Sequence, residues 1–432
     1  MTVATAPASV RPASRLRGRL ELPADKSIGH RALIVNALAG GPAVVEMRTP
    51  GRDVLSTVAC LQELGVDIMA AADGPITRFT ISGMPSRDAT LDCGNSGTTM
   101  RLLAGALSGL PVRVVLDGDA SLRARPMERV ASLLRAAGAE VATTDGHAPM
   151  TIVGRSELSA VTHRLPVASA QLLGAAALAA LVARGETQIE SPGPTRDHTE
   201  RMLAAAGVPV RRDSLVTTLS GPIRPRPLNL TVPGDVSSAA PWLVAGAVHA
   251  DAEVTLTGVG LNPTRTALVD LLRRMGADVE SRITDAGGPE PLGELRVRGG
   301  RPLRAVRIVG GDVAQLIDEL PLIAVAMAAA DGVSELRDAS ELRVKESDRI
   351  AATVAGLVAI GASVEELPDG WRVSRDTPRE ARIVTHGDHR IAIAFAVAAL
   401  GGVASAVELD DPECVAVSYP SFWSDLAEVA SS

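Results

Sequence analysis

A polar cluster that opens an alanine-rich apolar segment recurs six times along this chain of 432 residues. One residue from each cluster marks its position, and successive markers lie 69, 74, 66, 77 and 76 residues apart. Such a regular spacing indicates that one supersecondary unit has been copied along the chain. Six units of about 72 residues account for the whole length. The markers are Lys26, Asn95, Ser169, Asp235, Asp312 and Asp388.

Each unit is predicted to alternate helices and strands. In five of the six copies a second helical pattern follows, reaches a glycine and leads into a β-rich run, which is typical of a helix that ends on a C′ glycine. The five junctions read CLQELGVDI, LLRAAGAEV, MLAAAGVPV, LLRRMGADV and GLVAIGASV. Short β-rich runs, such as residues 80–82 and 296–298, close the units. The pattern predicts an α/β fold built from a βαβαββ-type unit.

The length predicts two domains with three units each, because a single hydrophobic core rarely extends over a chain of this size. Similar proline-containing segments, Leu22-Pro23 and Val232-Pro233, lead into the first and fourth units. If the first 22 residues supply a strand to the second half, the chain crosses between domains twice. We therefore expect one domain over 23–234 and a second over 1–22 plus 235–432, joined by a double-crossover hinge that can close on a ligand.

The six polar clusters have a functional meaning as well. Asp, Ser and Asn are favoured N-cap residues, and the N–H groups and dipole of a helix start attract anions. One such end is weak evidence of a site, but six of them, some with Lys or Arg, indicate a cleft for phosphate and carboxylate groups. The net charge of −7 requires those cations to be concentrated locally, and it disfavours a nucleic-acid or anionic-membrane surface.

The chain contains only two lysines, Lys26 and Lys345, against 41 arginines. Arginine replaces lysine on a solvated surface at little cost, but not where a compact charge must fit between anions or an amine must release a proton. Chance survival is the alternative for either residue. Both lysines, however, lie in dense polar strings, DKSIGHR and RVKESDR. We therefore take both as candidate site residues.

No cofactor is expected. Cys60, Cys93 and Cys414 form no CxxC pair and no His/Cys ligand spacing, so neither a disulfide framework nor a zinc site is predicted. The first twenty residues lack the apolar centre of a secretory signal; a transit peptide is an alternative that a strand beginning near Leu16 disfavours. The longest apolar stretch, residues 172–183, is too short to span a bilayer. We expect a cytoplasmic monomer without nucleic-acid or membrane partners.

Nine strings resemble those of the enolpyruvyl transferases, in the order of that family and over essentially the whole chain. The resemblance implies that each domain is an inside-out α/β barrel of three units. It also implies transfer of the enolpyruvyl group of phosphoenolpyruvate to the 5-hydroxyl of shikimate 3-phosphate, with release of phosphate by addition–elimination. The strings are DKSIGHRALI (25–34), GNSGTTMRLL (94–103), GDASLRARPM (118–127), VASAQ (167–171), TRDHTERML (195–203), NPTRTALVDLLRRMGADV (262–279), LIDELP (316–321), LRVKESDRI (342–350) and GDHRIAIAF (387–395).

The same resemblance implies roles for residues. Asp318 would be the base that deprotonates the attacking hydroxyl, and the adjacent Glu319 is the alternative for this role. Lys345 and Glu346 would handle the other proton transfers, and Lys26 would bridge the two substrates. The residues implied to bind phosphoenolpyruvate are Lys26, Asn95, Gly97, Arg125, Gln171, Arg349 and Arg390. Those implied to bind shikimate 3-phosphate are Lys26, Ser27, Arg31, Ser169, Ala170, Gln171, Arg196, Asp318 and Lys345. His198 and His389 are expected to be structural.

Three rival interpretations stay open. The sister enzyme that uses UDP-N-acetylglucosamine carries a reactive cysteine where this chain has Ala120, and Lys-Asn where it has Lys26-Ser27. A non-enzymatic anion-binding repeat protein would not need Asp318, Lys345 and Glu346. An RNA-end-processing enzyme of related fold is disfavoured by the acidic charge and the 2% aromatic content. Two of the strings also have non-functional alternatives when each is considered alone: RVKESDRI as a solvated, salt-bridged helix, and GDHR as an ordinary capped helix start.

Three positions depart from the pattern common in the family. Ala170 replaces a serine, Val417 a lysine and Leu102 a frequent proline. The first change removes a hydroxyl from the expected shikimate 3-phosphate site, and the second removes a cation from the expected phosphoenolpyruvate site. Gly97 lacks the methyl group that narrows the site in glyphosate-tolerant relatives, so glyphosate is expected to compete with phosphoenolpyruvate.

Overall fold

The computed structural model describes residues 9–431, which form two compact units. The N-terminal unit comprises residues 24–232 together with 287–290. The C-terminal unit comprises residues 9–23, 233–286 and 291–431. The short segment 287–290 thus belongs to the N-terminal unit although its sequence neighbours on both sides belong to the C-terminal unit.

The N-terminal unit contains three sheets, of order β14-β2-β4-β3, β5-β6-β8-β7 and β10-β11-β13-β12 with β9 beside β11. Its helices are α1 (Lys26–Ala39), α2 (Arg52–Glu63), α3 (Gly97–Ser108), α4 (Ala120–Arg123), α5 (Glu128–Ala136), α6 (Ala170–Ala180) and α7 (His198–Ala205). Its strands are β2 (Ala43–Arg48), β3 (Asp67–Asp73), β4 (Ile76–Ser82), β5 (Ala89–Asp92), β6 (Arg113–Asp117), β7 (Glu140–Thr144), β8 (His147–Val153), β9 (Leu158–Ser159), β10 (Thr162–Arg164), β11 (Ala183–Glu190), β12 (Val210–Asp213), β13 (Val216–Gly221) and β14 (Leu230–Thr231).

The C-terminal unit contains sheets of order β1-β15-β17-β16 and β18-β19-β21-β20 and the pair β22-β23. Its helices are α8 (Val236–Val248), α9 (Ala267–Arg274), α10 (Gly311–Leu316), α11 (Leu320–Ala329), α12 (Arg349–Ala359), α13 (His389–Leu400) and α14 (Phe422–Ser431), with 3-10 turns η1 (Ser340–Val344) and η2 (Pro412–Val417). Its strands are β1 (Leu16–Glu21), β15 (Ala252–Gly260), β16 (Asp278–Asp285), β17 (Leu292–Arg298), β18 (Arg307–Ile308), β19 (Val333–Leu336), β20 (Ser363–Leu367), β21 (Gly370–Ser374), β22 (Glu380–Ile383) and β23 (Ala406–Leu409).

The sheets repeat one pairing pattern. In each four-stranded path the first two strands are parallel and the rest antiparallel, as in β1-β15 against β15-β17 and β16-β17. A parallel pair needs a crossover. Helices supply it for β5-β6, β10-β11, β18-β19 and β22-β23, whereas β1-β15 and β14-β2 pair strands from distant parts of the chain. The outer antiparallel pair of each four-stranded path, such as β3-β4 or β20-β21, is joined by a short turn. The sixth copy keeps only the parallel pair β22-β23, which agrees with the second helical pattern occurring in five copies. The predicted α/β fold of repeated units is confirmed.

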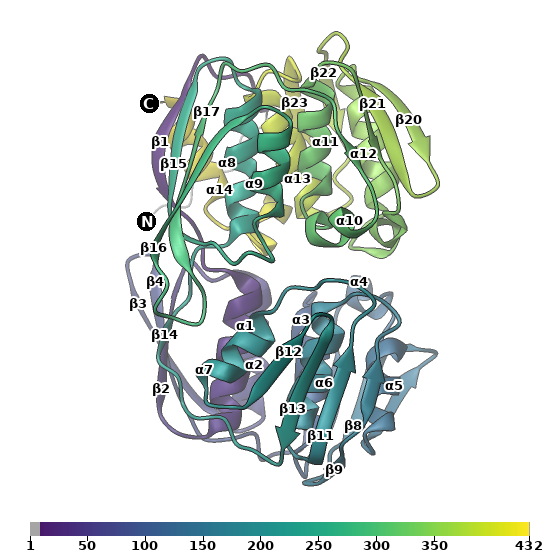
Figure 1. Cartoon of the computed structure of the whole chain (residues 1–432). Coiled ribbons are helices and arrows are strands. Elements are labelled where there is room, and N and C mark those ends of the chain that lie inside the picture. The colour runs from purple at the N-terminus through teal and green to yellow at the C-terminus, as the bar shows by residue number, and fades with distance from the viewer. Residues whose placement is uncertain (1–8, 432) are drawn as a thin grey trace. The chain divides into compact units, whose positions relative to one another are not determined.

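Three alanine-rich helices form the core of each unit. In the N-terminal unit these are α1, α3 and α6, which are buried around nearly their whole circumference. Helices α8, α11 and α13 do the same in the C-terminal unit and run side by side (Figure 1). Small side chains let the helices approach closely: a Cβ on Gly105 of α3 would lie 2.2 Å from the carbonyl oxygen of Ala175 in α6. A helix that is apolar on all sides is typical of a buried position, which agrees with the alanine-rich sequences of these helices.

The fifth repeat differs from the prediction. The sequence suggested one helix that begins at Asp312, but the chain forms two helices, α10 and α11, with a break at residues 317–319. Pro321 lies in the first turn of α11, where its missing N–H costs no hydrogen bond, so the helix restarts at Leu320. The inner helix therefore begins beside Asp318 and Glu319 rather than at Asp312. Within residues 9–431 no helix is long and apolar enough to cross a membrane.

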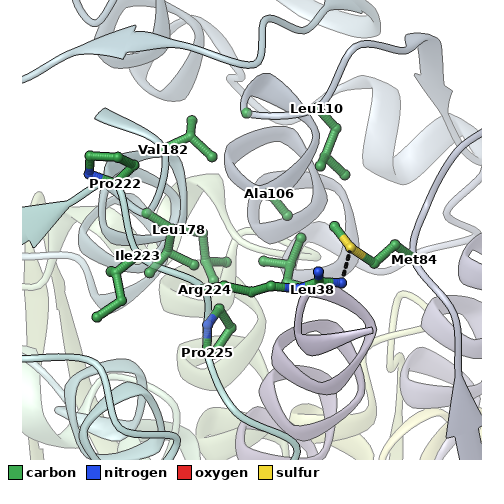
Figure 2. Close-up of a pocket in the computed structure, with 12 residues that line it drawn as sticks. Leu38, Met84, Ala106, Leu110, Leu178, Val182, Pro222, Ile223, Arg224 and Pro225 are labelled. Carbon is green, nitrogen blue, oxygen red and sulfur yellow. Dashed lines mark hydrogen bonds between the residues drawn. The ribbon is translucent and has the colours of Figure 1, made fainter. Parts of the chain in front are cut away.

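A largely apolar cavity of about 310 Å³ lies at the C-terminal ends of α1, α3 and α6 (Figure 2). Lys26 is at the N-terminal end of α1, whereas the cavity lies at its C-terminal end. A helix of this length separates its two ends by about 20 Å. The lining residues include Leu38, Ala106, Leu110, Leu178, Leu181, Ile223 and Arg224.

We expect Ala106→Leu to stabilise the protein by about 1 kcal/mol, because the added methyl groups fill the cavity and bury apolar surface. Thermal unfolding followed by circular dichroism measures this change. Tryptophan fluorescence would not report on this unit, because Trp242, Trp371 and Trp423 all belong to the C-terminal unit. Ala104→Leu is the matched control: Ala104 is fully buried in the same helix and is not among the cavity's lining residues, so overpacking should destabilise the protein. Equal effects of the two variants would contradict the cavity explanation.

Candidate active site

The N-termini of the three inner helices of the N-terminal unit lie together. Each is capped by a residue of its predicted polar cluster. Asp25 Oδ1 accepts from the N–H of Ile28 at 3.0 Å, and Ser96 and Ser169 accept from the N–H groups of Thr99 and Leu172. Side chains join these ends, since Gln171 Nε2 donates to Thr98 Oγ1 at 2.9 Å. Three helix dipoles therefore direct their positive ends to one region.

Lys26 lies at the start of α1 and is partly exposed. Its Nζ is 3.3 Å from Asp53 Oδ2, on the first turn of α2. The carbonyl of Asp53 accepts from Thr99 Oγ1 at 3.4 Å, so the same residue links the lysine to α3. Asp53 was not predicted from the sequence, and no motif marked it. Its carboxylate holds the ammonium group without burying it.

Arg31 joins three helices. Its guanidinium donates to the carbonyl of Ser27 at 2.9 Å, to the carbonyl of Ala170 at 3.2 Å and to Thr199 Oγ1 at 2.7 Å. Burial lowers the pKa of Arg31 to about 10, although the carboxylates of Glu200 and Asp25 act in the opposite direction. The side chain therefore stays protonated at neutral pH. The positive charge of the half-buried Arg196 also lowers the pKa of Arg31, so the two guanidinium groups lie in the same region.

A second group of side chains surrounds the loop before α3. Arg125 Nη2 donates to Asn95 Oδ1 at 2.5 Å, and Asn95 Nδ2 donates to Asp119 Oδ2 at 2.8 Å. Gln171 Oε1 accepts from Arg101 Nη1 at 2.6 Å. Gly97 lies between the two arginines, because a Cβ there would be 2.9 Å from Arg101 Nη1 and 3.3 Å from Arg125 Nη1. Arg101 was missed in the sequence, although its place one helical turn after Gly97 was a usable signal.

Buried polar groups support this end of the unit from behind. His30 Nδ1 is 2.7 Å from Thr57 Oγ1, which is 2.7 Å from Thr99 Oγ1. His198 Nδ1 is 2.7 Å from Glu290 Oε1, and both side chains are almost fully buried. His198 is therefore held by a carboxylate from the segment 287–290, which no local sequence pattern indicated.

We expect the unfolding free energy to fall as the pH drops below about 6.5, because burial, and then the charges of Lys26 and Arg31, lower the pKa of His30. The folded protein keeps this histidine neutral while the unfolded chain protonates it, so stability is complete above the unfolded pKa and declines below it. Urea unfolding at several pH values should show a shallower decline for His30→Gln, by up to about 1.4 kcal/mol per pH unit. His147→Gln is the control, because His147 is the first residue of β8 and is partly exposed. An unchanged slope in His30→Gln would contradict the assignment.

In the C-terminal unit the predicted acid and base residues meet at the break before α11. Lys345 Nζ and Arg349 Nη1 both lie 3.8 Å from Asp318 Oδ1. Glu346 Oε2 accepts from Arg349 Nη2 at 2.6 Å. Lys345, Glu346 and Asp318 are all partly exposed. The string RVKESDRI is thus not a solvated helix: it runs from η1 through an irregular segment into α12.

Two arginines of the expected phosphoenolpyruvate clamp differ in their surroundings. Arg349 is buried, and its guanidinium donates to both oxygens of Asp388 at 2.8 and 3.2 Å as well as to Glu346. Burial alone would lower the pKa of Arg349, but Glu346, Asp388 and Asp318 raise it above its ordinary value. The guanidinium of Arg390 makes one ion pair among residues 9–431, with Glu319 at 3.6 Å. Sequence alone could not distinguish the two.

The other predicted residues have these positions. Ser27 and Ser169 lie at helix starts, and Ala170 is the first residue of α6, where its N–H has no partner within the helix. Val417 is half-buried in η2. Residues 9–431 contain no group of three His, Cys, Asp or Glu side chains arranged to hold a metal ion.

The repeated fold first identifies a class of proteins, because it is the fold of the enolpyruvyl transferases. The enolpyruvyl transferase NikO from Streptomyces tendae shares it over 98% of this chain and 96% of its own, with a TM-score of 0.75 at 21% identity. An EPSP synthase structure from Acinetobacter baumannii matches with a TM-score of 0.84 at 37% identity, over 98% and 97% of the two chains.

Residues 10–426 match the model of the EPSP synthase (3-phosphoshikimate 1-carboxyvinyltransferase) family, and the chain belongs to that family. A relative named 3-phosphoshikimate 1-carboxyvinyltransferase from Herpetosiphon aurantiacus is 46% identical over 96% of this chain and 98% of its own. One of the same name from Roseiflexus sp. is 47% identical over 98% and 99%. The resemblance read from nine strings is confirmed at the level of the family.

Proposed function

We propose that this chain transfers the enolpyruvyl group of phosphoenolpyruvate to the 5-hydroxyl of shikimate 3-phosphate and releases phosphate. Membership of the EPSP synthase family over residues 10–426 is the observation that carries this proposal. Two polyanionic substrates require clustered cations, and each unit supplies such a cluster at its helix starts. A cytoplasmic location and a monomeric state stay predictions.

The N-terminal cluster would bind the charged groups of the substrates. The positive helix starts and Lys26, which bridges the two reactants, would neutralise phosphate and carboxylate. Bidentate guanidinium contacts suit the planar carboxylate of phosphoenolpyruvate. Ala170 lacks a hydroxyl, but its backbone N–H at the start of α6 would serve a phosphate oxygen. We assign phosphoenolpyruvate to Lys26, Asn95, Gly97, Arg125 and Gln171, and shikimate 3-phosphate to Lys26, Ser27, Arg31, Ser169, Ala170, Gln171 and Arg196.

The C-terminal cluster would move protons. Asp318 would accept the proton of the attacking 5-hydroxyl, with Lys345 Nζ and Arg349 Nη1 each 3.8 Å from its Oδ1. Lys345 and Glu346 would protonate the methylene carbon of phosphoenolpyruvate and assist departure of phosphate. Arg390 would bind phosphoenolpyruvate most directly, whereas Arg349 has its Nε and Nη2 groups already engaged and would contribute through Nη1.

The test is phosphate release from phosphoenolpyruvate with each of two acceptors. We expect release with shikimate 3-phosphate and none above background with UDP-N-acetylglucosamine. Ala120, at the start of α4, lacks the thiol that the second reaction uses in the sister enzyme. Turnover with the second acceptor would favour that alternative, and no turnover with either would favour a non-enzymatic anion-binding protein.

We expect glyphosate to compete with phosphoenolpyruvate and Gly97→Ala to raise the inhibitory concentration of glyphosate about tenfold. The new methyl group would press on the ends of Arg101 and Arg125, which can shift by a few tenths of an ångström. The KM for phosphoenolpyruvate should rise less, because it is the smaller ligand. Gly193→Ala is the control, since its Cβ would make only an ordinary contact, 3.5 Å from Ala168. Full wild-type activity at millimolar glyphosate would contradict this prediction.

A further inference from the structure

The start of α8 in the C-terminal unit repeats the start of α1 with one change. Asp25-Lys26-Ser27 corresponds to Asp235-Val236-Ser237, so the cap and the serine are kept and the lysine is replaced by an apolar residue. In α8 the aspartate also caps the helix, with Asp235 Oδ1 accepting from the N–H of Ser237 at 2.7 Å. A helix start of this kind favours a nearby anion.

Here the anion is part of the chain. Ser237 Oγ donates to Glu319 Oε1 at 2.5 Å, so the carboxylate of Glu319 stands where the helix start attracts negative charge. Ser237 Oγ in turn accepts from Arg265 Nη2 at 2.7 Å, and the same nitrogen is 3.1 Å from Asp235 Oδ1. Each of these side chains is at least nine-tenths buried. The network fixes Glu319 from behind, because the serine hydroxyl is at once donor and acceptor.

On its other side Glu319 faces Arg390. The distance from Glu319 Oε1 to Arg390 Nη1 is 3.6 Å, and Arg390 is 7% exposed. A buried guanidinium needs a counter-charge, and this carboxylate is the one that the described residues supply to it. Glu319 is therefore suited to set the direction in which the remaining N–H groups of Arg390 point.

We infer that Glu319 is a positioning residue: with Ser237, Arg265 and Asp235 behind it, it holds Arg390 in the orientation that binds phosphoenolpyruvate. Glu319 does not itself touch substrate. This inference rests on the proposed function, which gives Arg390 its ligand. It also assigns different tasks to two adjacent carboxylates, with Asp318 acting on the substrate and Glu319 on Arg390.

Steady-state kinetics of Glu319→Gln test the inference. The amide keeps the size of the side chain and can still accept from Ser237, but it loses the charge that orients Arg390. We expect the KM for phosphoenolpyruvate to rise about tenfold, while the KM for shikimate 3-phosphate changes less than twofold. Ser237→Ala should give a smaller rise of the same kind. Glu319→Asp should recover part of the loss, and the exposed-site variant Glu341→Gln should behave as wild type.

A double-mutant cycle separates positioning from a general structural effect. If Arg390→Lys raises the KM about 100-fold and Glu319 acts only through Arg390, the double variant should be no worse than Arg390→Lys alone. A multiplied loss of about 1000-fold, or equal effects on both KM values with a lowered melting temperature, would overturn the inference. A fall in the KM would overturn it too, since it would mean that Glu319 merely offsets positive charge.

The role of Glu319 can still be tested if the protein does not catalyse the proposed reaction. Absence of turnover by the wild type with shikimate 3-phosphate refutes the proposed function, not the arrangement around Glu319. In that case crystal structures of the wild type and Glu319→Gln decide. A displaced Arg390 guanidinium in the variant supports positioning, and an unmoved one overturns it.

Discussion

Lys26→Arg is expected to lower kcat/KM for phosphoenolpyruvate at least 100-fold, a loss of about 2.7 kcal/mol in transition-state stabilisation. The ammonium group lies 3.3 Å from Asp53 Oδ2 with its side chain 23% exposed, so it is held in place yet open to a ligand. A guanidinium is wider and planar and cannot put one compact charge between two anions. Lys345→Arg should behave likewise, because its Nζ lies 3.8 Å from Asp318 Oδ1. Steady-state assays of both variants measure the effect.

The control for this prediction is a substitution in the reverse direction, since the chain has no other lysine. Arg164→Lys changes a side chain that is 83% exposed and paired with Glu190, and it should leave turnover unchanged. The melting temperatures of all three variants should match the wild type within about 2 °C, as surface substitutions usually change stability little. If Lys26→Arg kept half of the activity, the two lysines would be remnants of composition rather than site residues.

Asp318→Asn is expected to lower kcat about 1000-fold, within the range of general-base contributions. Asparagine keeps the shape but cannot take the proton of the attacking hydroxyl. The KM for phosphoenolpyruvate should stay equal or fall, because Lys345 and Arg349 lose a competing anion 3.8 Å away. Single-turnover measurements separate the chemical step from substrate binding.

Asp312→Asn serves as the matched control, because Asp312 lies in the same repeat but its carboxylate pairs with Arg274 at 2.9 Å on the surface. It should keep wild-type kcat. A loss of less than threefold in Asp318→Asn would remove Asp318 as the base. In that case Glu346 would be the next carboxylate to substitute.

Helix starts and repeat order were predictable because they depend on local chemistry. In five of the six predicted polar clusters one residue caps the helix that follows; these residues are Asp25, Ser96, Ser169, Asp235 and Asp388. The error at Asp312 was also local: Pro321 fits only the first turn of a helix, and that signal outweighs an aspartate nine residues earlier.

The partners of the charged groups were not predictable. Arg349 and Arg390 occupy similar places in polar strings, yet Arg349 is surrounded by carboxylates, whereas Arg390 forms its one ion pair within residues 9–431 with Glu319. Asp53, Arg101 and Glu290 lie far along the chain from the residues that they contact. No periodicity within one segment carries that information.

The sequence alone determined the repeated α/β fold, the helix starts and the residue types available for binding anions, because caps, glycines and apolar periodicity act over a few neighbours. The tertiary structure alone decided which of those charges face a carboxylate of the chain and which stay open to a ligand. The reason is electrostatic: the state of a buried charge depends on groups a few ångströms away in space, and folding brings those groups from distant repeats.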